Sequence, residues 1–214
     1  MALTKQQWYA ERTKGIGGSE CSAILGLNPY ISNVELWETK TKRKNNDITG
    51  NSSRNMLFGT KMEPILRKRF SRLYNDRYKV IYFANDLIRH REYNFIFSTL
   101  DGRLIDKKTN EVGTLEIKTA YLISTTNKWS KDKIPDNYYC QCLQQLLTTG
   151  YDFVIVYAML YYRYNNRYKY NLRSYYIKSK DKQMEIEYLK NKEIDFWNNH
   201  VLKDLKPNLI LPRI

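Results

Sequence analysis

The chain has 214 residues, enough for a single domain with a sizeable buried core. Hydrophobic residues make up 42% of the sequence and aromatic residues 14%, which excludes a wholly disordered chain. Lys and Arg number 36 against 22 Asp and Glu, giving a formal net charge of +14. That excess predicts a polyanionic partner. Nucleic acid is favoured over an acidic membrane surface, and over a charge that only aids solubility.

The sequence shows no apolar run near the ~20 residues that a membrane span needs. The amino-terminal stretch MALTKQQWYAERTK lacks an apolar signal core. We therefore expect no membrane association, no export and a cytoplasmic protein. The three cysteines, Cys21, Cys140 and Cys142, fit a reducing compartment. Their number and spacing are poor for a zinc or iron–sulfur site, so we predict small buried hydrophobic side chains.

The first third of the chain reads mainly as helix. A Gly-rich turn, GIGGSEC, is predicted to open an apolar helix with Ser19 as its N-cap, which stops at Asn28-Pro29. Pro64 is assigned to the first turn of a later amphipathic helix. The predicted helices span 4–14, 19–28, 32–43 and 56–74, and the polar segment 44–55 is predicted to be a mobile loop.

The periodicity then changes to short β-rich runs separated by turn residues. We predict largely antiparallel strands within 78–84, 87–93, 95–106 and 112–120, a helix over 135–150, a strand over 151–162 that pairs with 168–178, and a helix over 181–202. This order predicts one α/β domain over 1–214, with a central mixed sheet flanked by helices and a carboxy-terminal helix and tail at 179–214.

Three charged residues lie near the turn 107–111, in the stretches STLDGRL and GTLEIKT. Because side chains alternate along a strand, Glu116 and Lys118 share one face. If the strand of Asp101 pairs with theirs, the two carboxylates converge and suit Mg²⁺, with the lysine beside it to polarise water or steady phosphate charge. An exposed Glu–Lys strand face is the competing interpretation, and spacing alone favours it.

Other candidate residues have equally simple alternatives. Glu63 can be a helix N-terminal charge. Arg12, the N–H groups of the Gly-rich turn and Ser19 can form an anion cradle or merely a capped turn. Gln141, early in its helix, can be an ordinary surface residue.

In this order the motifs resemble the YqaJ-type viral recombinase family, which is typified by lambda exonuclease and belongs to the PD-(D/E)xK nuclease superfamily. The resemblance covers roughly residues 6–160 and rests on QWYAERTKGIGGSECSAILGLNPY, FGTKMEPILRKRF, STLDGRL, LEIKT and YYCQCLQQLL. It implies the restriction-endonuclease-like core of that superfamily. The residue before Asp101 is Leu100, where the superfamily name records a proline.

The resemblance also implies a role for each matching residue. Asp101 and Glu116 would bind Mg²⁺ with the Ile117 carbonyl, and Lys118 would act on the attacking water. Glu63 would assist at a second metal ion, and Gln141 would position the lysine or the scissile phosphate; Mn²⁺ could replace Mg²⁺. The residues that would bind the 5′-phosphate of the digested strand are Arg12, Ser19 and Thr99.

The expected activity is a Mg²⁺-dependent 5′–3′ exonuclease that acts on linear double-stranded DNA and leaves 3′ single-stranded overhangs. The resemblance implies bacteriophage recombination, a single-strand annealing protein as partner, and a ring-shaped homotrimer around DNA. Two alternatives stay open: an endonuclease of the same superfamily without an end requirement, and a non-catalytic DNA-binding nuclease-fold module. An iron–sulfur nuclease is disfavoured because three cysteines cannot supply four thiolates.

Overall fold

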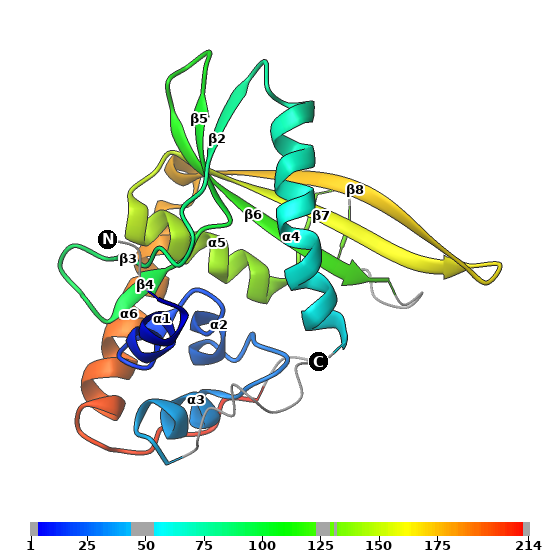
Figure 1. The fold of residues 1–214 in the computed structure, drawn as a ribbon. Coiled ribbons are helices and arrows are strands. Elements are labelled where there is room, and N and C mark those ends of the chain that lie inside the picture. Colours follow the sequence, from blue (N-terminus) through cyan, green and yellow to red (C-terminus); the bar gives the residue numbers. More distant parts are fainter. Residues whose placement is uncertain (1–3, 44–53, 123–128, 131, 212–214) are drawn as a thin grey trace.

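The computed structural model describes residues 4–43, 54–122, 129–130 and 132–211. A mixed five-stranded sheet forms the centre, and helices cover both of its faces (Figure 1). The predicted α/β class and the flanked mixed sheet are therefore confirmed. None of the described helices combines the length and the apolarity needed to cross a bilayer.

The amino-terminal helices begin at clear capping signals. Thr4 and Gln7 form a capping box at the start of one helix, and Ser32 and Glu35 form another. The helices of this half are α1 (Lys5–Arg12), α2 (Cys21–Ile24), α3 (Asn33–Lys40) and α4 (Arg54–Leu73).

Two predictions in this half were wrong. Helix α2 is a single turn capped by Glu20 rather than a long helix capped by Ser19, because Gly26 adopts a left-handed φ of 67° that ends it. Pro64 lies inside α4, not in its first turn. Pro64 is exposed, so the carbonyl that it leaves without a helical hydrogen bond can be hydrated. The predicted loop 44–55 lies mostly outside the described residues, and its last two residues belong to α4.

The strands form two sheets. In the large sheet β6 and β7 are parallel and the other neighbours are antiparallel, in the order β2-β5-β6-β7-β8. Its strands are β2 (Tyr78–Ile81), β5 (Gly102–Asp106), β6 (Val112–Tyr121), β7 (Phe153–Tyr164) and β8 (Arg167–Lys178). The small sheet contains β1 (Ile16–Gly17), β4 (Ile96–Ser98) and β3 (Ile88–Arg89), in the order β1-β4-β3.

The predicted strand run 95–106 is divided between the two sheets. Its first part, β4, joins the small sheet and its second part, β5, joins the large one. The chain changes sheet at residues 99–101, which belong to neither strand. This crossing is the feature that brings Asp101 to the edge of β6.

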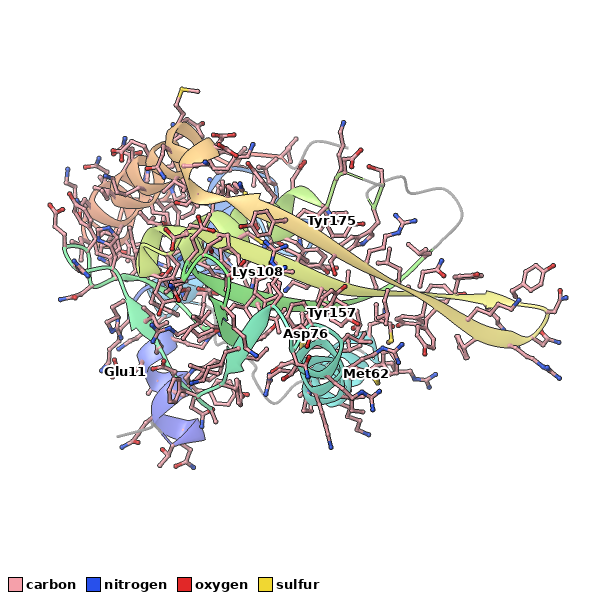
Figure 2. The ribbon with its side chains drawn as sticks, turned by 90° about the horizontal axis from the view of Figure 1, so that it is seen from above. Glu11, Met62, Asp76, Lys108, Tyr157 and Tyr175 are labelled. Carbon is pink, nitrogen blue, oxygen red and sulfur yellow. The ribbon has the colours of Figure 1, made fainter. Side chains whose placement is uncertain are left out.

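Two hydrophobic clusters hold the layers together. On one face of the large sheet, Leu66 and Phe70 of α4 pack with Leu115, Ile117 and Tyr157. The other face packs against α5 (Asp136–Thr149) and α6 (Gln183–Asp195). A 3₁₀ turn, η1 (Ser179–Asp181), precedes α6, and a π-helical segment, η2 (Phe196–Val201), follows it. Figure 2 shows the sheet between α4 on one side and α6 on the other.

The ends of α5 and the state of the cysteines agree with the sequence. Helix α5 ends at Gly150, whose φ of 67° is the left-handed C-cap that glycine favours. The three cysteines are buried free thiols, as predicted, and lie in the hydrophobic cluster between the large sheet and α5 and α6: Cys21, Cys140 and Cys142.

Candidate active site

The site lies where β5 leaves the edge of β6. Pairing between these strands extends from Ile105↔Val112 to Gly102↔Leu115, and beyond it the chain of β5 diverges. The side chain of Asp101 takes the place of the departing strand: its Oδ2 accepts a 2.7 Å hydrogen bond from the backbone N–H of Ile117. In an extended strand the N–H and C=O of one residue point to the same edge. The Ile117 carbonyl therefore also points toward Asp101.

Glu116 lies next to Ile117 and points toward α5. Its side chain is only 2% exposed, yet both carboxylate oxygens have partners. Oε1 lies 2.6 Å from Nζ of Lys118, and Oε2 accepts a 2.5 Å hydrogen bond from Nε2 of Gln145. The predicted shared face of Glu116 and Lys118 is confirmed. The alternative of a solvated strand face is excluded because Glu116 is buried.

Lys118 links β6 to α5. Its Nζ donates a 2.9 Å hydrogen bond to Oε1 of Gln141 and lies 4.6 Å from the ring centroid of Tyr138. Burial by itself would lower the pKa of Lys118, but the carboxylates of Glu116 and Asp101 outweigh it and raise the pKa. Lys118 is therefore held as an ammonium ion, which can donate hydrogen bonds and supply positive charge.

Glu63 reaches the site from α4. It forms a salt bridge with Arg67 one helical turn further on. Burial raises the pKa of Glu63, Arg67 opposes that rise, and the charge of Glu116 adds to it. The electrostatic influence of Glu116 indicates that these two carboxylates, from different elements, lie in one neighbourhood.

The donor set fits a hard divalent cation. Burial raises the pKa of Asp101 well above its usual range, and the charges of Glu116 and Glu63 raise it further. A divalent cation relieves such crowding of like charges, and carboxylate and carbonyl oxygens are the ligands that Mg²⁺ prefers. Among the described residues no three His, Cys, Asp or Glu side chains form a ready-made metal cluster. In this arrangement Glu63 contacts Arg67, and Glu116 contacts Lys118 and Gln145.

The residues of the expected phosphate cradle lie beside this cluster. Nη2 of Arg12 donates a 3.2 Å hydrogen bond to Oγ of Ser19, and the guanidinium lies 4.6 Å from the ring centroid of Trp8. Between them in sequence, Gly18 packs on Gln141: a Cβ at Gly18 would lie 3.2 Å from the Cγ of that glutamine. Through Gln141, which also binds Lys118, the cradle is connected to the carboxylate site.

One part of the predicted cradle is not available for an anion. The N–H of Gly17 donates a 2.9 Å hydrogen bond to Oε2 of Glu20, and the same oxygen lies 2.8 Å from Nζ of Lys40. Since α2 is one turn long and has Glu20 at its N-cap position, it offers no helix dipole of useful length. The cationic and hydroxyl groups of Arg12 and Ser19 remain as the candidate phosphate ligands.

Thr99 meets the site through its backbone. It lies in the crossing between the two sheets, and its carbonyl accepts a 3.2 Å hydrogen bond from Nε2 of Gln145. Two residues later the same crossing delivers Asp101. Thr99 is therefore held to the same side chain that holds Glu116.

Gln145 is the residue of this site that sequence reasoning missed. Its amide contacts Glu116 and Thr99, while its Oε1 accepts a 2.8 Å hydrogen bond from Oγ1 of Thr114. The available signal was its spacing, because Gln145 follows Gln141 by four residues and so shares its helix face. From the sequence we considered a surface role for Gln141 only and did not single out Gln145, which is fully buried.

Comparisons with known proteins agree with this architecture. The family model described as the YqaJ-like viral recombinase domain matches residues 7–152. The protein YqaJ of Bacillus subtilis (strain 168) is 30% identical over 208 residues, which are 97% of this chain and 60% of that protein. The chain thus spans less than two thirds of this relative's length.

Solved structures share the fold. An alkaline exonuclease, LHK-Exo from Laribacter hongkongensis, matches with a TM-score of 0.63 at 18% identity, and the match covers 94% of each chain. The complex of LHK-Exo with dAMP matches with a TM-score of 0.65, the same identity and the same coverage. At 18% identity this structural similarity establishes the restriction-endonuclease-like fold of the chain, but it does not establish which reaction the chain catalyses.

Proposed function

We propose that this chain, which belongs to the family of YqaJ-like viral recombinase domains, is a divalent-metal-dependent exonuclease that degrades linear double-stranded DNA from its 5′ ends. The observation that carries the proposal is the convergence of Asp101, Glu116 and Lys118 at the edge of β6. The net charge of +14 supplies attraction for a polyanionic substrate. The similarity to structures of an alkaline exonuclease adds independent support.

In this proposal the cation is Mg²⁺, held by Asp101, Glu116 and the Ile117 carbonyl, with Glu63 serving a second ion; Mn²⁺ can substitute. When bound, such ions polarise the scissile phosphate and lower the pKa of the attacking water. The crowded carboxylates described above support this assignment, since burial and the charge of Glu116 raise the pKa of Asp101 and of Glu63 although Lys118 and Arg67 oppose that rise.

The chain's own groups position the reactants. Lys118, held as an ammonium ion by Glu116 and Gln141, orients the attacking water and stabilises the negative charge that grows on the phosphate. Gln141 fixes the direction of that ammonium group. Arg12 and Ser19, together with Thr99, bind the terminal 5′-phosphate. Binding of that phosphate places the phosphodiester bond nearest the 5′ end at the site of hydrolysis.

Digestion from 5′ ends leaves 3′ single-stranded overhangs, and such overhangs are substrates for annealing. We therefore assign the protein to DNA recombination of the bacteriophage type, in the host-cell cytoplasm, with a single-strand annealing protein as partner. We also propose a homotrimeric ring around DNA, which sedimentation of the protein with and without duplex tests directly.

The proposal is tested with a linear duplex bearing 5′-phosphates and a covalently closed circle of the same sequence. We expect Mg²⁺-dependent release of nucleotides from the linear DNA and an intact circle. Equal cleavage of the circle would instead identify an endonuclease without an end requirement. Binding of both DNAs without hydrolysis would identify a non-catalytic module.

A further inference from the structure

The hairpin of β7 and β8 extends beyond the rest of the large sheet. Pairing of β6 with β7 ends at Tyr121↔Tyr161, whereas β7 and β8 stay paired as far as Tyr164↔Arg167. The two turn residues, Asn165 and Asn166, both have positive φ, as a tight two-residue hairpin requires. Figure 1 shows this ribbon projecting from the body past the end of β6.

The ribbon has an unusual composition. Between Asp152 and Asp181 the sequence contains no Asp or Glu, but it contains six basic residues: Arg163, Arg167, Lys169, Arg173, Lys178 and Lys180. The two strands also hold eight of the nineteen tyrosines on 24 of the 214 residues. Tyr157 and Tyr175 belong to the core, as strand tyrosines commonly do, but Tyr164, Tyr168, Tyr170 and Tyr176 are exposed.

Aromatic rings cluster around the partly buried Tyr161 on the α4 face of the ribbon. Ring centroids of Phe58 and Tyr161 lie 5.0 Å apart, those of Tyr121 and Tyr161 lie 5.3 Å apart, and those of Tyr161 and Tyr168 lie 6.3 Å apart. Strand register places Tyr170 opposite Tyr161, on the same face. Tyr168 is 71% exposed and Tyr170 is 53% exposed. Exposed rings beside a guanidinium group offer faces on which bases can stack, and Arg163 lies opposite Tyr168 in the strand register.

The rings lie on the opposite face of the sheet from Glu116 and Lys118, which point toward α5, but they follow the same strands away from the site. Lys118 pairs in register with Ala158, and Tyr164 at the ribbon's end follows Ala158 by six residues. At about 3.3 Å per residue, the ribbon reaches about 20 Å from the level of Lys118, the length of about six stacked nucleotides. A strand leaving the site along the ribbon would therefore contact it several nucleotides from the scissile phosphate.

We infer that the α4 face of the β7–β8 ribbon, with Tyr161, Arg163, Tyr168 and Tyr170, binds single-stranded DNA. Bases are free to stack on protein rings only where the duplex is open, so tyrosines favour a single strand, while the positive charges follow its phosphates. The inference rests on the proposed function in that DNA is the ligand. It goes beyond that function by naming a second contact surface and the form of DNA bound there.

The test measures binding of a fluorescein-labelled 20-nucleotide oligothymidylate to the full chain in EDTA, by anisotropy. One variant combines Tyr168→Ala with Tyr170→Ala, and another combines Arg163→Gln with Arg167→Gln. Tyr188→Ala is the matched control, because Tyr188 lies on α6 and is 55% exposed. Lys203→Gln with Lys206→Gln, two exposed lysines of the carboxy-terminal segment, controls for the loss of two charges.

We expect the double tyrosine variant to bind oligothymidylate about tenfold or more weakly, and a blunt duplex of equal length much less affected. The pair Tyr168→Phe and Tyr170→Phe keeps the rings and should bind within about twofold of the wild type. The double arginine variant should lower the slope of log affinity against log salt by about 1.4, since each cation contributes about 0.7 on single strands.

Affinities of the ribbon variants equal to those of their controls would overturn the inference. Equal losses of affinity for duplex and single-stranded DNA would overturn it too, because they would show that the ribbon attracts DNA by charge and does not stack on unpaired bases. So would a changed sedimentation coefficient with unchanged DNA affinity, which would make the ribbon a contact between copies of the chain. Because EDTA prevents metal-dependent hydrolysis, binding is read independently of activity. A protein that binds through the ribbon but digests no DNA would refute the proposed function and leave this inference intact.

Discussion

Gln145 donates a 2.5 Å hydrogen bond from its side-chain amide to Oε2 of Glu116, inside the interface between α5 and β6. This bond fixes the orientation of a carboxylate that the proposed cation requires. Replacing Gln145 by Leu keeps the volume but leaves the Glu116 oxygen without that donor. Groups that orient a metal ligand typically contribute 10- to 100-fold in metal affinity or activity. We expect Gln145→Leu to raise the Mg²⁺ concentration for half-maximal activity by a factor in that range.

The control is Gln183→Leu, which changes an α6 glutamine whose side-chain amide donates to the carbonyl and hydroxyl oxygens of Ser179 near the surface. Unfolding by denaturant separates stability from function, because loss of a buried hydrogen-bond partner costs about 1–3 kcal/mol. If Gln145→Leu is folded and has the metal dependence of the wild type, then Gln145 does not orient Glu116 for metal binding.

Lys118→Met should remove the chemical step while keeping substrate binding. The ammonium group is held between Glu116 and Gln141, and a positioned charge of this kind contributes on the order of 100- to 1,000-fold to a rate. Single-turnover digestion under saturating enzyme measures the rate, and anisotropy measures DNA affinity. Lys118→Arg keeps the charge and should retain more activity than Lys118→Met. Equal rates for the wild type and Lys118→Met would remove the lysine from the mechanism.

Arg12 and Ser19 are expected to read the 5′-phosphate. The wild type should digest a 5′-phosphorylated duplex faster than a 5′-hydroxyl duplex, and Arg12→Gln should reduce that preference by removing the cation. Arg77→Gln is a suitable control, because Arg77 pairs with Asp106 at the end of β5 opposite Asp101. A full preference for the phosphorylated end in Arg12→Gln would place the phosphate ligand elsewhere.

Glu193 should make the protein less stable as the pH rises. Its side chain is fully buried on α6, and neither carboxylate oxygen has a hydrogen-bond partner among the described residues. Burial raises the pKa of Glu193 well above its ordinary value of 4.5. Between those two values the folded state binds more protons than the unfolded state, so wild-type stability falls as pH rises through that window.

Glu193→Gln cannot ionise and removes this pH dependence. The difference in melting temperature between Glu193→Gln and the wild type should therefore increase from pH 4 to pH 8, whatever its value at pH 4. Each unit of pKa shift corresponds to about 1.4 kcal/mol. Asp181→Gln, at an exposed residue in η1, serves as the control. A difference that stays constant with pH would mean that Glu193 titrates normally.

The local signals in the sequence predicted most of the elements. Capping residues such as Ser32, and Gly150 after α5, act on the nearest few residues, so helix ends could be located from them. The resemblance also selected Asp101, Glu116, Lys118 and Gln141, which the fold brings together.

The features that could not be predicted from the sequence depend on contacts between residues that are distant in the chain. Pro64 is tolerated inside α4 because it lies on the solvent-exposed face of that helix. The run 95–106 divides because its first part pairs in the small sheet and its second part in the large sheet. Gln145 becomes a functional candidate only when α5 is laid on β6. The Tyr-rich β7–β8 hairpin was predicted as a strand pair, but its projection beyond β6 follows from the sheet register.

The most direct test of the central claim is digestion of a linear duplex, labelled at its 5′ ends, by the wild type and by Asp101→Asn. The asparagine keeps the size of the side chain but removes the charge that the cation needs. We predict that the wild type releases labelled nucleotides from the 5′ ends only with Mg²⁺ or Mn²⁺, and that Asp101→Asn binds the duplex but releases none. Undiminished release of labelled nucleotides by folded Asp101→Asn would contradict the account, because hydrolysis would then not depend on the carboxylates at the edge of β6.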